Sequence, residues 1–204
     1  MTTTETVTKT RGRPRAFDED QVLDTLVDFF WIHGYEAASM NDIVDAAGLN
    51  KSSLYNAFGS KDELFFTVLD RYIDGKELML REALSEGGVD ALVGFFASQR
   101  EMLLSTIGKN GCMAVNASTE LGLRDERAVT MADRYRAMLR ESIRRPLVWS
   151  ADRDEVDPLL VDAYTEMLVS AMFGMSVSAR AGASEAELET LLDSMVALIT
   201  SWKR

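Results

Sequence analysis

The residues with a chemically informative spacing lie between Ser39 and Lys61. Within this stretch, Asn50 is followed by a lysine, two serines, a tyrosine and an asparagine. One ammonium, one phenol and several short polar groups on a single helix face can hydrogen-bond to base edges in the major groove and to flanking phosphates. We therefore predict DNA contacts from Ser39, Lys51, Ser52, Ser53, Tyr55, Asn56 and Lys61.

Catalytic chemistry has much less support. The chain contains one histidine, His33, and one cysteine, Cys112, and it lacks the phosphate-binding run G-x-x-x-x-G-K-[ST]. A catalytic nucleophile needs an adjacent base, and a metal site needs several ligands at a suitable spacing. We predict no catalytic residue, no metal site and no cofactor. An enzyme with an appended helical module and an architectural DNA-binding protein without effector are the alternative hypotheses.

Two short helices joined by a tight turn would position the polar residues. Ser39 can cap the first helix, Gly48 allows the turn, and Asn50 can cap the second helix. The whole motif covers about residues 39–58. Leu54 and Phe58 are spaced to face inward from the second helix. Ser60 and Glu63 then form a capping box for a long helix that reaches about Leu84.

This stretch resembles the DNA-binding motif of the TetR/AcrR family of bacterial repressors. The similarity is carried by A-G-L-N-K-S-S-L-Y-N-A-F-G-S-K-D-E-L and covers about residues 10–70. It implies a homodimer that binds a pseudo-palindromic operator in double-stranded DNA. It further implies that a small-molecule effector binds the C-terminal domain and releases the repressor.

The charge of the chain is unevenly distributed. The net charge is −11, yet residues 1–15 hold four cations against one acid. The run R-G-R-P-R suits a narrow, A·T-rich minor groove, where arginine meets an enhanced negative potential. We predict that Arg11, Arg13 and Arg15 contact DNA; the alternative is a solvated tail.

The remaining sequence predicts further helices and hardly any strand. Their ranges are about 89–107, 112–121, 125–145, 157–180 and 184–202, with Pro146 ending the third and a polar loop over 146–157. With a first helix over 18–33, the fold class is all-α with about nine helices. We expect a basic arm at 1–15, a three-helix helix-turn-helix domain at 16–70, and an effector-binding and dimerisation domain at 71–204.

A ligand site in the C-terminal domain is predicted from polar residues at helical spacing and from adaptable methionines. Cys112, Asn116 and Thr119 share a helix face, which can orient a small molecule in an apolar pocket. Cys112 has three interpretations: a small core residue, a pocket residue or a reactive thiol. Glu166 is either a ligand contact or a solvated side chain. The candidate pocket residues are Met102, Cys112, Met113, Asn116, Thr119, Met138 and Met172.

The last two helices form the candidate dimer surface. Small residues in the first and leucines in the second allow close helix contact and would give a four-helix interface between two chains. The alternative is that both apolar stripes face the core of their own chain. The predicted interface residues are Tyr164, Met167, Ala171, Gly174, Met175, Leu188, Leu191, Met195 and Leu198.

The cellular location is expected to be the cytoplasm of a bacterium, at the nucleoid when the protein is bound to its operator. A single cysteine fits a reducing compartment, and the N-terminal threonines do not resemble a signal peptide. The longest uncharged run, residues 167–179, is too short to span a bilayer.

Overall fold

The structure, a computed structural model, describes residues 17–85 and 87–203. Over these residues the chain forms nine α-helices and two 3-10 helices, without strands. The predicted all-α fold class is confirmed. The elements are α1 Glu19–His33, α2 Met40–Ala47, α3 Lys51–Phe58, α4 Lys61–Ala83, α5 Gly88–Leu104, η1 Gly108–Asn110, α6 Met113–Leu121, α7 Glu126–Ala151, η2 Pro158–Leu160, α8 Val161–Arg180 and α9 Glu185–Thr200.

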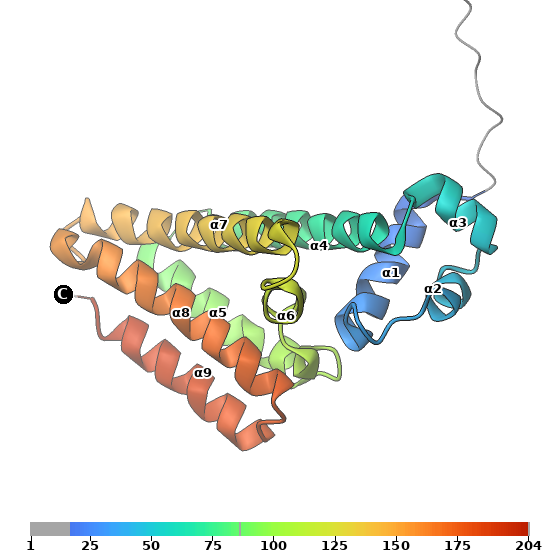
Figure 1. Ribbon diagram of the computed structural model, residues 1–204. Helices are drawn as coiled ribbons and strands as arrows, with labels where there is room; N and C mark the ends of the chain where they lie inside the picture. Colours follow the sequence, from blue (N-terminus) through green and yellow to red (C-terminus); the bar gives the residue numbers. More distant parts are fainter. Residues whose placement is uncertain (1–16, 86, 204) are drawn as a thin grey trace, which may run out of the picture.

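The helices form a small head and a larger body (Figure 1). The head consists of α1, α2 and α3 and lies at one end of the molecule, whereas α5, α8 and α9 lie in the body. The long helix α4 starts beside α3, packs against α1 and then runs into the body beside α7. The short helix α6 lies between the head and the rest of the body.

The head and α4 share one apolar core. Leu26 and Phe30 from α1, Ile43 from α2, Leu54 from α3 and Phe65 from α4 are almost completely buried. The rings of Phe30 and Phe65 meet edge to face with 5.1 Å between centroids, which is a favourable arrangement of aromatic rings. Because α4 contributes to this core, a change in its direction must also move the head.

The structure corrects the predicted end of the helix at Pro146. Helix α7 continues through this proline to Ala151, so residues 146–151 are helical rather than part of a polar loop. A proline inside a helix costs about 3 kcal/mol, because it lacks an N–H and crowds the preceding turn. Leu147 and Ser150, which follow it, are fully buried, and the Ser150 hydroxyl accepts a hydrogen bond from the Val89 N–H at 3.0 Å. Burying the leucine contributes about 2 kcal/mol and the hydrogen bond about 1 kcal/mol, enough together to offset the proline.

Candidate DNA-binding surface and internal cavity

The turn between α2 and α3 has the geometry of a helix-turn-helix. Gly48 has φ 63° and ψ 24°, a left-handed conformation that glycine adopts without a steric penalty. Its N–H bonds the carbonyl of Asp45 at 3.2 Å, and the Leu49 N–H bonds the carbonyl of Val44 at 3.3 Å. These bonds satisfy the last carbonyls of α2 and set the direction in which α3 departs.

Helix α3 lies at the end of the head away from the body (Figure 1). Lys51, Ser52, Tyr55 and Asn56 are exposed, whereas Leu54 is buried and anchors the opposite side. Such a surface has the shape and the donors needed to enter a major groove.

Ser39 and Ser53 take part in the caps of α2 and α3, Ser39 through its side chain and Ser53 through its backbone N–H. The Ser53 N–H donates to the Asn50 side chain at 2.8 Å, and the Ser53 side chain is half-buried. Ser39 accepts a hydrogen bond from the Asp42 N–H, while its own N–H and hydroxyl donate to the Asp42 carboxylate. These hydrogen bonds keep the pKa of Asp42 below its usual value. The caps formed by Ser39 and Asn50 therefore fix the helix starts that orient the α3 surface.

Lys61 lies at the first position of α4, close to the end of α3. Its ammonium lies over the ring of Tyr35, 4.2 Å from the centroid. The Tyr35 hydroxyl donates to Asp62, and burial together with this carboxylate raises the pKa of Tyr35 to about 12. The contact with the ring holds Lys61 against the head.

The described head carries few positive charges. Between residues 17 and 64 the sequence holds two lysines, Lys51 and Lys61, against ten acidic residues. The arginines Arg11, Arg13 and Arg15, predicted to contact DNA, lie outside the described residues. Attraction to phosphate depends on cations. Lys51, the exposed lysine of α3, is therefore the main candidate among the described residues of this helix for a phosphate contact.

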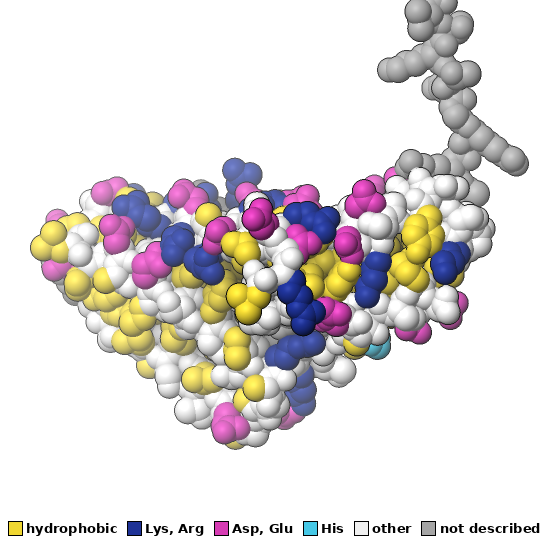
Figure 2. Space-filling model, in the orientation of Figure 1, with side chains coloured by type: hydrophobic (Ala, Val, Ile, Leu, Met, Phe, Trp, Pro, Cys, Tyr) yellow, Lys and Arg dark blue, Asp and Glu magenta, His cyan; other side chains and the backbone are white. Residues whose placement is uncertain are grey.

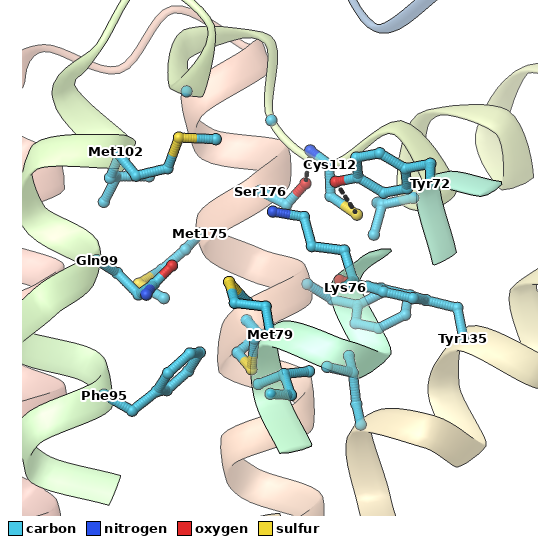
Figure 3. Close-up of a pocket in the computed structure, with 18 of the residues that line it drawn as sticks. Tyr72, Lys76, Met79, Phe95, Gln99, Met102, Cys112, Tyr135, Met175 and Ser176 are labelled. Atoms are coloured by element: carbon cyan, nitrogen blue, oxygen red, sulfur yellow. Dashed lines mark hydrogen bonds between the residues drawn. The ribbon is translucent and has the colours of Figure 1, made fainter. Parts of the chain in front are cut away.

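A cavity of about 120 Å³ lies in the body next to the head (Figure 3). Its wall is mostly apolar and aromatic and is built from α1, α4, α5, α6, α7 and α8 with the η1 turn. Concave apolar sites of this kind with a few convergent polar groups are typical of small-molecule binding. An engineered apolar cavity of about 150 Å³ holds benzene, so this one matches a ligand of similar size.

Four polar side chains meet in one part of the cavity. The Tyr72 hydroxyl donates to the Cys112 sulfur at 3.4 Å, and the Cys112 N–H donates to the Ser176 hydroxyl at 2.7 Å. Lys76 extends between them into the cavity (Figure 3). Burial, reinforced by the nearby thiol, raises the pKa of Tyr72 and of Tyr135 well above that of an ordinary phenol.

The predicted pocket residues divide into two groups. Met102, Cys112 and Met172 line the cavity. Met113 is instead buried in the core, Asn116 donates from its amide to the Asn110 carbonyl at 2.8 Å, and Thr119 is exposed and bonds the Asn116 carbonyl. Met138 is half-buried beside Ser142, outside the cavity wall. Cys112 is the N-cap of α6 and has an extended backbone, so helical spacing does not determine where its side chain lies relative to Asn116 and Thr119.

Sequence reasoning missed the aromatic and cationic parts of the wall. Trp31 lies in the predicted first helix, and nothing in its sequence surroundings indicates that its side chain reaches the C-terminal domain. Lys76 stands in D-G-K-E-L, a run that reads as the solvated side of a helix. The missed lining residues with polar atoms are Trp31, Tyr72, Lys76, Gln99, Tyr135 and Ser176.

Trp31 connects the head to the cavity. It belongs to α1, lines the cavity, and donates its indole N–H to the Gly111 carbonyl at 2.8 Å. Its ring meets that of Tyr72 edge to face with 5.2 Å between centroids. A molecule in the cavity would therefore touch a side chain of the head itself.

A second connection runs from α6 to the segment after α1. The Glu120 carboxylate accepts hydrogen bonds from the N–H groups of Tyr35 at 3.0 Å and Glu36 at 2.7 Å. Glu36 also pairs with Arg124 in the loop after α6. Hydrogen bonds to a charged group are stronger than neutral ones, so these bonds hold α6 against the head.

An uncharged face extends along α8 and α9. Apolar side chains gather on this side of the body in Figure 2. Met167 and Val177 on α8 and Leu191 and Leu198 on α9 are exposed, and the smaller Ala163, Ser170 and Gly174 lie between them on the α8 face.

Two of the predicted interface residues do not belong to this face. Leu188 is fully buried inside its own chain, and Met175 lines the cavity. Tyr164 stacks on Trp202 with 3.9 Å between centroids, and Ala171 and Met195 are half-buried at the edge of the face. Glu166 pairs with Arg140 at the surface rather than entering the cavity. The sequence periodicity identified an apolar stripe on α8 and another on α9. It did not show which residues of α9 pack against α5 and which stay exposed.

Within the described residues, no three His, Cys, Asp or Glu side chains are grouped so as to hold a metal ion. Nor is any described helix long and apolar enough to cross a membrane.

Comparison with known proteins agrees with this geometry. Residues 22–68 match the family model described as bacterial regulatory proteins, tetR family. The transcriptional repressor ComR of Escherichia coli is 36% identical over 98% of this chain and 95% of its own length. The repressor BdcR of the same organism is 28% identical over 87% of this chain and 86% of its own.

Solved structures share the fold. The regulator CifR, a cysteine mutant in complex with 26-base-pair operator DNA, superposes with a TM-score of 0.74 at 25% identity, covering 91% of this chain and 98% of that one. Reduced NemR of Escherichia coli gives a TM-score of 0.75 at 17% identity over 91% of this chain and 96% of its own. With its helix-turn-helix head and a relative this similar over nearly its whole length, the chain belongs to the TetR family and is a DNA-binding transcription regulator.

Proposed function

We propose that this protein is a homodimeric repressor that leaves a pseudo-palindromic operator when a small molecule occupies the cavity. The observation that carries this proposal is the position of Trp31, which belongs to α1 of the head and also forms part of the cavity wall. An effector that displaces this side chain acts directly on α1, which packs against α2 and α4, the helices that contact α3.

The coupling must satisfy a thermodynamic condition. An effector releases DNA only if it binds the DNA-incompetent arrangement more tightly, and DNA then weakens effector binding by the same factor. Two discrete contacts can transmit the change, namely the bond from Trp31 to Gly111 and the bonds from the head to Glu120. Both join the head to the segment that carries Cys112 and α6.

Dimerisation is supported by the exposed uncharged face on α8 and α9. Two copies meeting through this face would form a four-helix interface with two-fold symmetry. Symmetry then places two copies of α3 in successive major grooves, about 34–36 Å apart or a multiple of this, and makes the operator pseudo-palindromic.

Relatives support repression and operator binding. ComR and BdcR are named as transcriptional repressors, and CifR is seen on operator DNA. Action at the nucleoid in the bacterial cytoplasm follows from this function and is part of the proposal.

The test is a release assay. A duplex selected by the protein from a random pool is labelled, and its fluorescence anisotropy is followed while a library of small carboxylates and neutral aromatics is added. We expect at least one compound to lower DNA affinity at least tenfold. If compounds bind the protein but none changes DNA affinity, the protein is a DNA binder without effector control; if a compound is turned over, it is an enzyme.

The variant Trp31→Phe tests the route. It keeps an aromatic ring in the wall but removes the donor to Gly111, a bond worth about 1 kcal/mol. Effector binding should persist, while the effect of the compound on DNA affinity should fall about fivefold. Trp202→Phe is the matched control, because Trp202 stacks on Tyr164 far from the head. Equal coupling in both variants would exclude Trp31 from the route.

A further inference from the structure

Among the described residues that line the cavity, Lys76 is the only one with a charged side chain. The wall contains no Asp, Glu, Arg or His among the described residues. The nearest aromatic faces are those of Trp31 and Tyr72, with centroids 5.3 and 5.5 Å from the ammonium. These rings attract a cation weakly, but they do not neutralise its charge.

Most other cations of the described body form ion pairs with carboxylates. Arg134 contacts Asp70 and Asp74, and Arg144 contacts Asp162 at 2.9 Å. No ion pair within the described residues involves Lys76, although carboxylates are abundant in this acidic chain. Within the described residues, Lys76 thus has no carboxylate partner and faces a cavity that a ligand can enter.

An unpaired ammonium in an apolar wall is costly. Removing it from water disfavours the charged form, and burial lowers the pKa of Lys76 accordingly. A methionine or leucine would fill the same wall without this cost. A bound anion would offset this cost, because its negative charge would lie next to the ammonium in a region of low dielectric, where their attraction is strong.

We propose that the cavity binds a small monocarboxylate, whose carboxylate pairs with Lys76 and whose apolar part lies against Met79, Phe95 and Met102. This inference rests on the proposed function, since it names the ligand class of the same effector site. The volume limits the ligand to roughly the size of benzoate or hexanoate. Gln99, on the α5 side of the cavity in Figure 3, offers an amide as a second polar contact.

The direct test measures binding without DNA. The purified full-length protein is titrated at pH 7 by calorimetry with benzoate and hexanoate, and with benzamide and hexanamide as neutral molecules of the same shape. We expect each acid to bind at least tenfold more tightly than its amide. In Lys76→Met, the difference should shrink to about twofold or less, and in Lys76→Arg it should be partly restored.

Lys109→Met is the matched control. It removes the same charge, but Lys109 is at the surface and pairs with Glu185 at 3.0 Å. It should keep the preference for acids. Thermal unfolding of each variant shows whether it is folded, so loss of binding through unfolding is distinguished from loss of the charge.

Several outcomes would overturn the inference. One is equal binding of acid and amide by the wild type, and another is an unchanged preference for acids in Lys76→Met. A third is a benzaldehyde adduct on Lys76, trapped by borohydride, in a protein that binds no acid; this would identify Lys76 as an amine that reacts with carbonyl compounds. Anisotropy with operator DNA separates the two proposals. If acids bind through Lys76 but do not release DNA, the present inference is supported and release of DNA by an effector is refuted. If only neutral compounds release DNA, the repressor proposal is supported and the present inference is refuted.

Discussion

Replacing Lys51 by alanine tests the DNA-binding surface most directly. Lys51 is exposed at the start of α3, and no carboxylate among the described residues pairs with it, so its removal leaves no orphaned partner. Each cation that neutralises a phosphate contributes about 0.9 to the slope of log affinity against log salt. A symmetric dimer loses two such contacts, which lowers the slope by about 1.8. Between 50 and 200 mM salt, the wild type should therefore lose about 12-fold more affinity than the variant.

The assay is fluorescence anisotropy with one operator duplex at four salt concentrations. Lys109→Ala is a suitable control, because it removes a cation that pairs with Glu185 in the body, away from the head. Its slope should equal that of the wild type. An unchanged slope in folded Lys51→Ala, or an equal change in both variants, would refute the assignment of α3 as the surface that meets DNA.

Three further predictions concern assembly and stability. Leu198→Glu places a charge in the uncharged face and should give monomers with weakened operator binding in analytical ultracentrifugation and anisotropy, whereas Leu123→Glu, at a fully exposed leucine, should stay dimeric. Gly111→Ala should lower the free energy of unfolding by about 2 kcal/mol or more in urea, since φ is +71° and a Cβ would lie 2.5 Å from a backbone oxygen of α8. Gly94→Ala, in a helix with open space around it, should instead raise it by about 0.5–1 kcal/mol. For Lys76, the folded-state pKa is lowered, so the unfolded chain binds more protons between that pKa and 10.5, and stability rises with pH there. In denaturation measured between pH 7 and 10, the stability of the wild type should approach that of Lys76→Met as pH rises. Tyr72, Tyr135 and Cys112 face the lysine, but they are present in both proteins, so the effect of their titration largely cancels in the difference. A constant gap would mean that the lysine is not desolvated.

The helix-turn-helix was accessible from the sequence because its signals are local. A capping serine, a turn glycine and a capping asparagine act within a few residues, and each was found in the predicted role. The alternation of Leu54 with exposed polar neighbours likewise determined which side of α3 faces solvent. The number and order of the helices followed from the same kind of local pattern.

The cavity and the extent of α7 were decided by tertiary structure. Lys76 and Trp31 have ordinary sequence surroundings, and only the packing of α1, α4 and α6 brings them to one wall. Pro146 predicted a helix end, but buried Leu147 and Ser150 outweighed that local preference. Local rules describe a residue and its neighbours in sequence, whereas a cavity depends on groups that are distant in the chain. The sequence by itself therefore determined the DNA-binding motif, and the fold determined which side chains a ligand would meet.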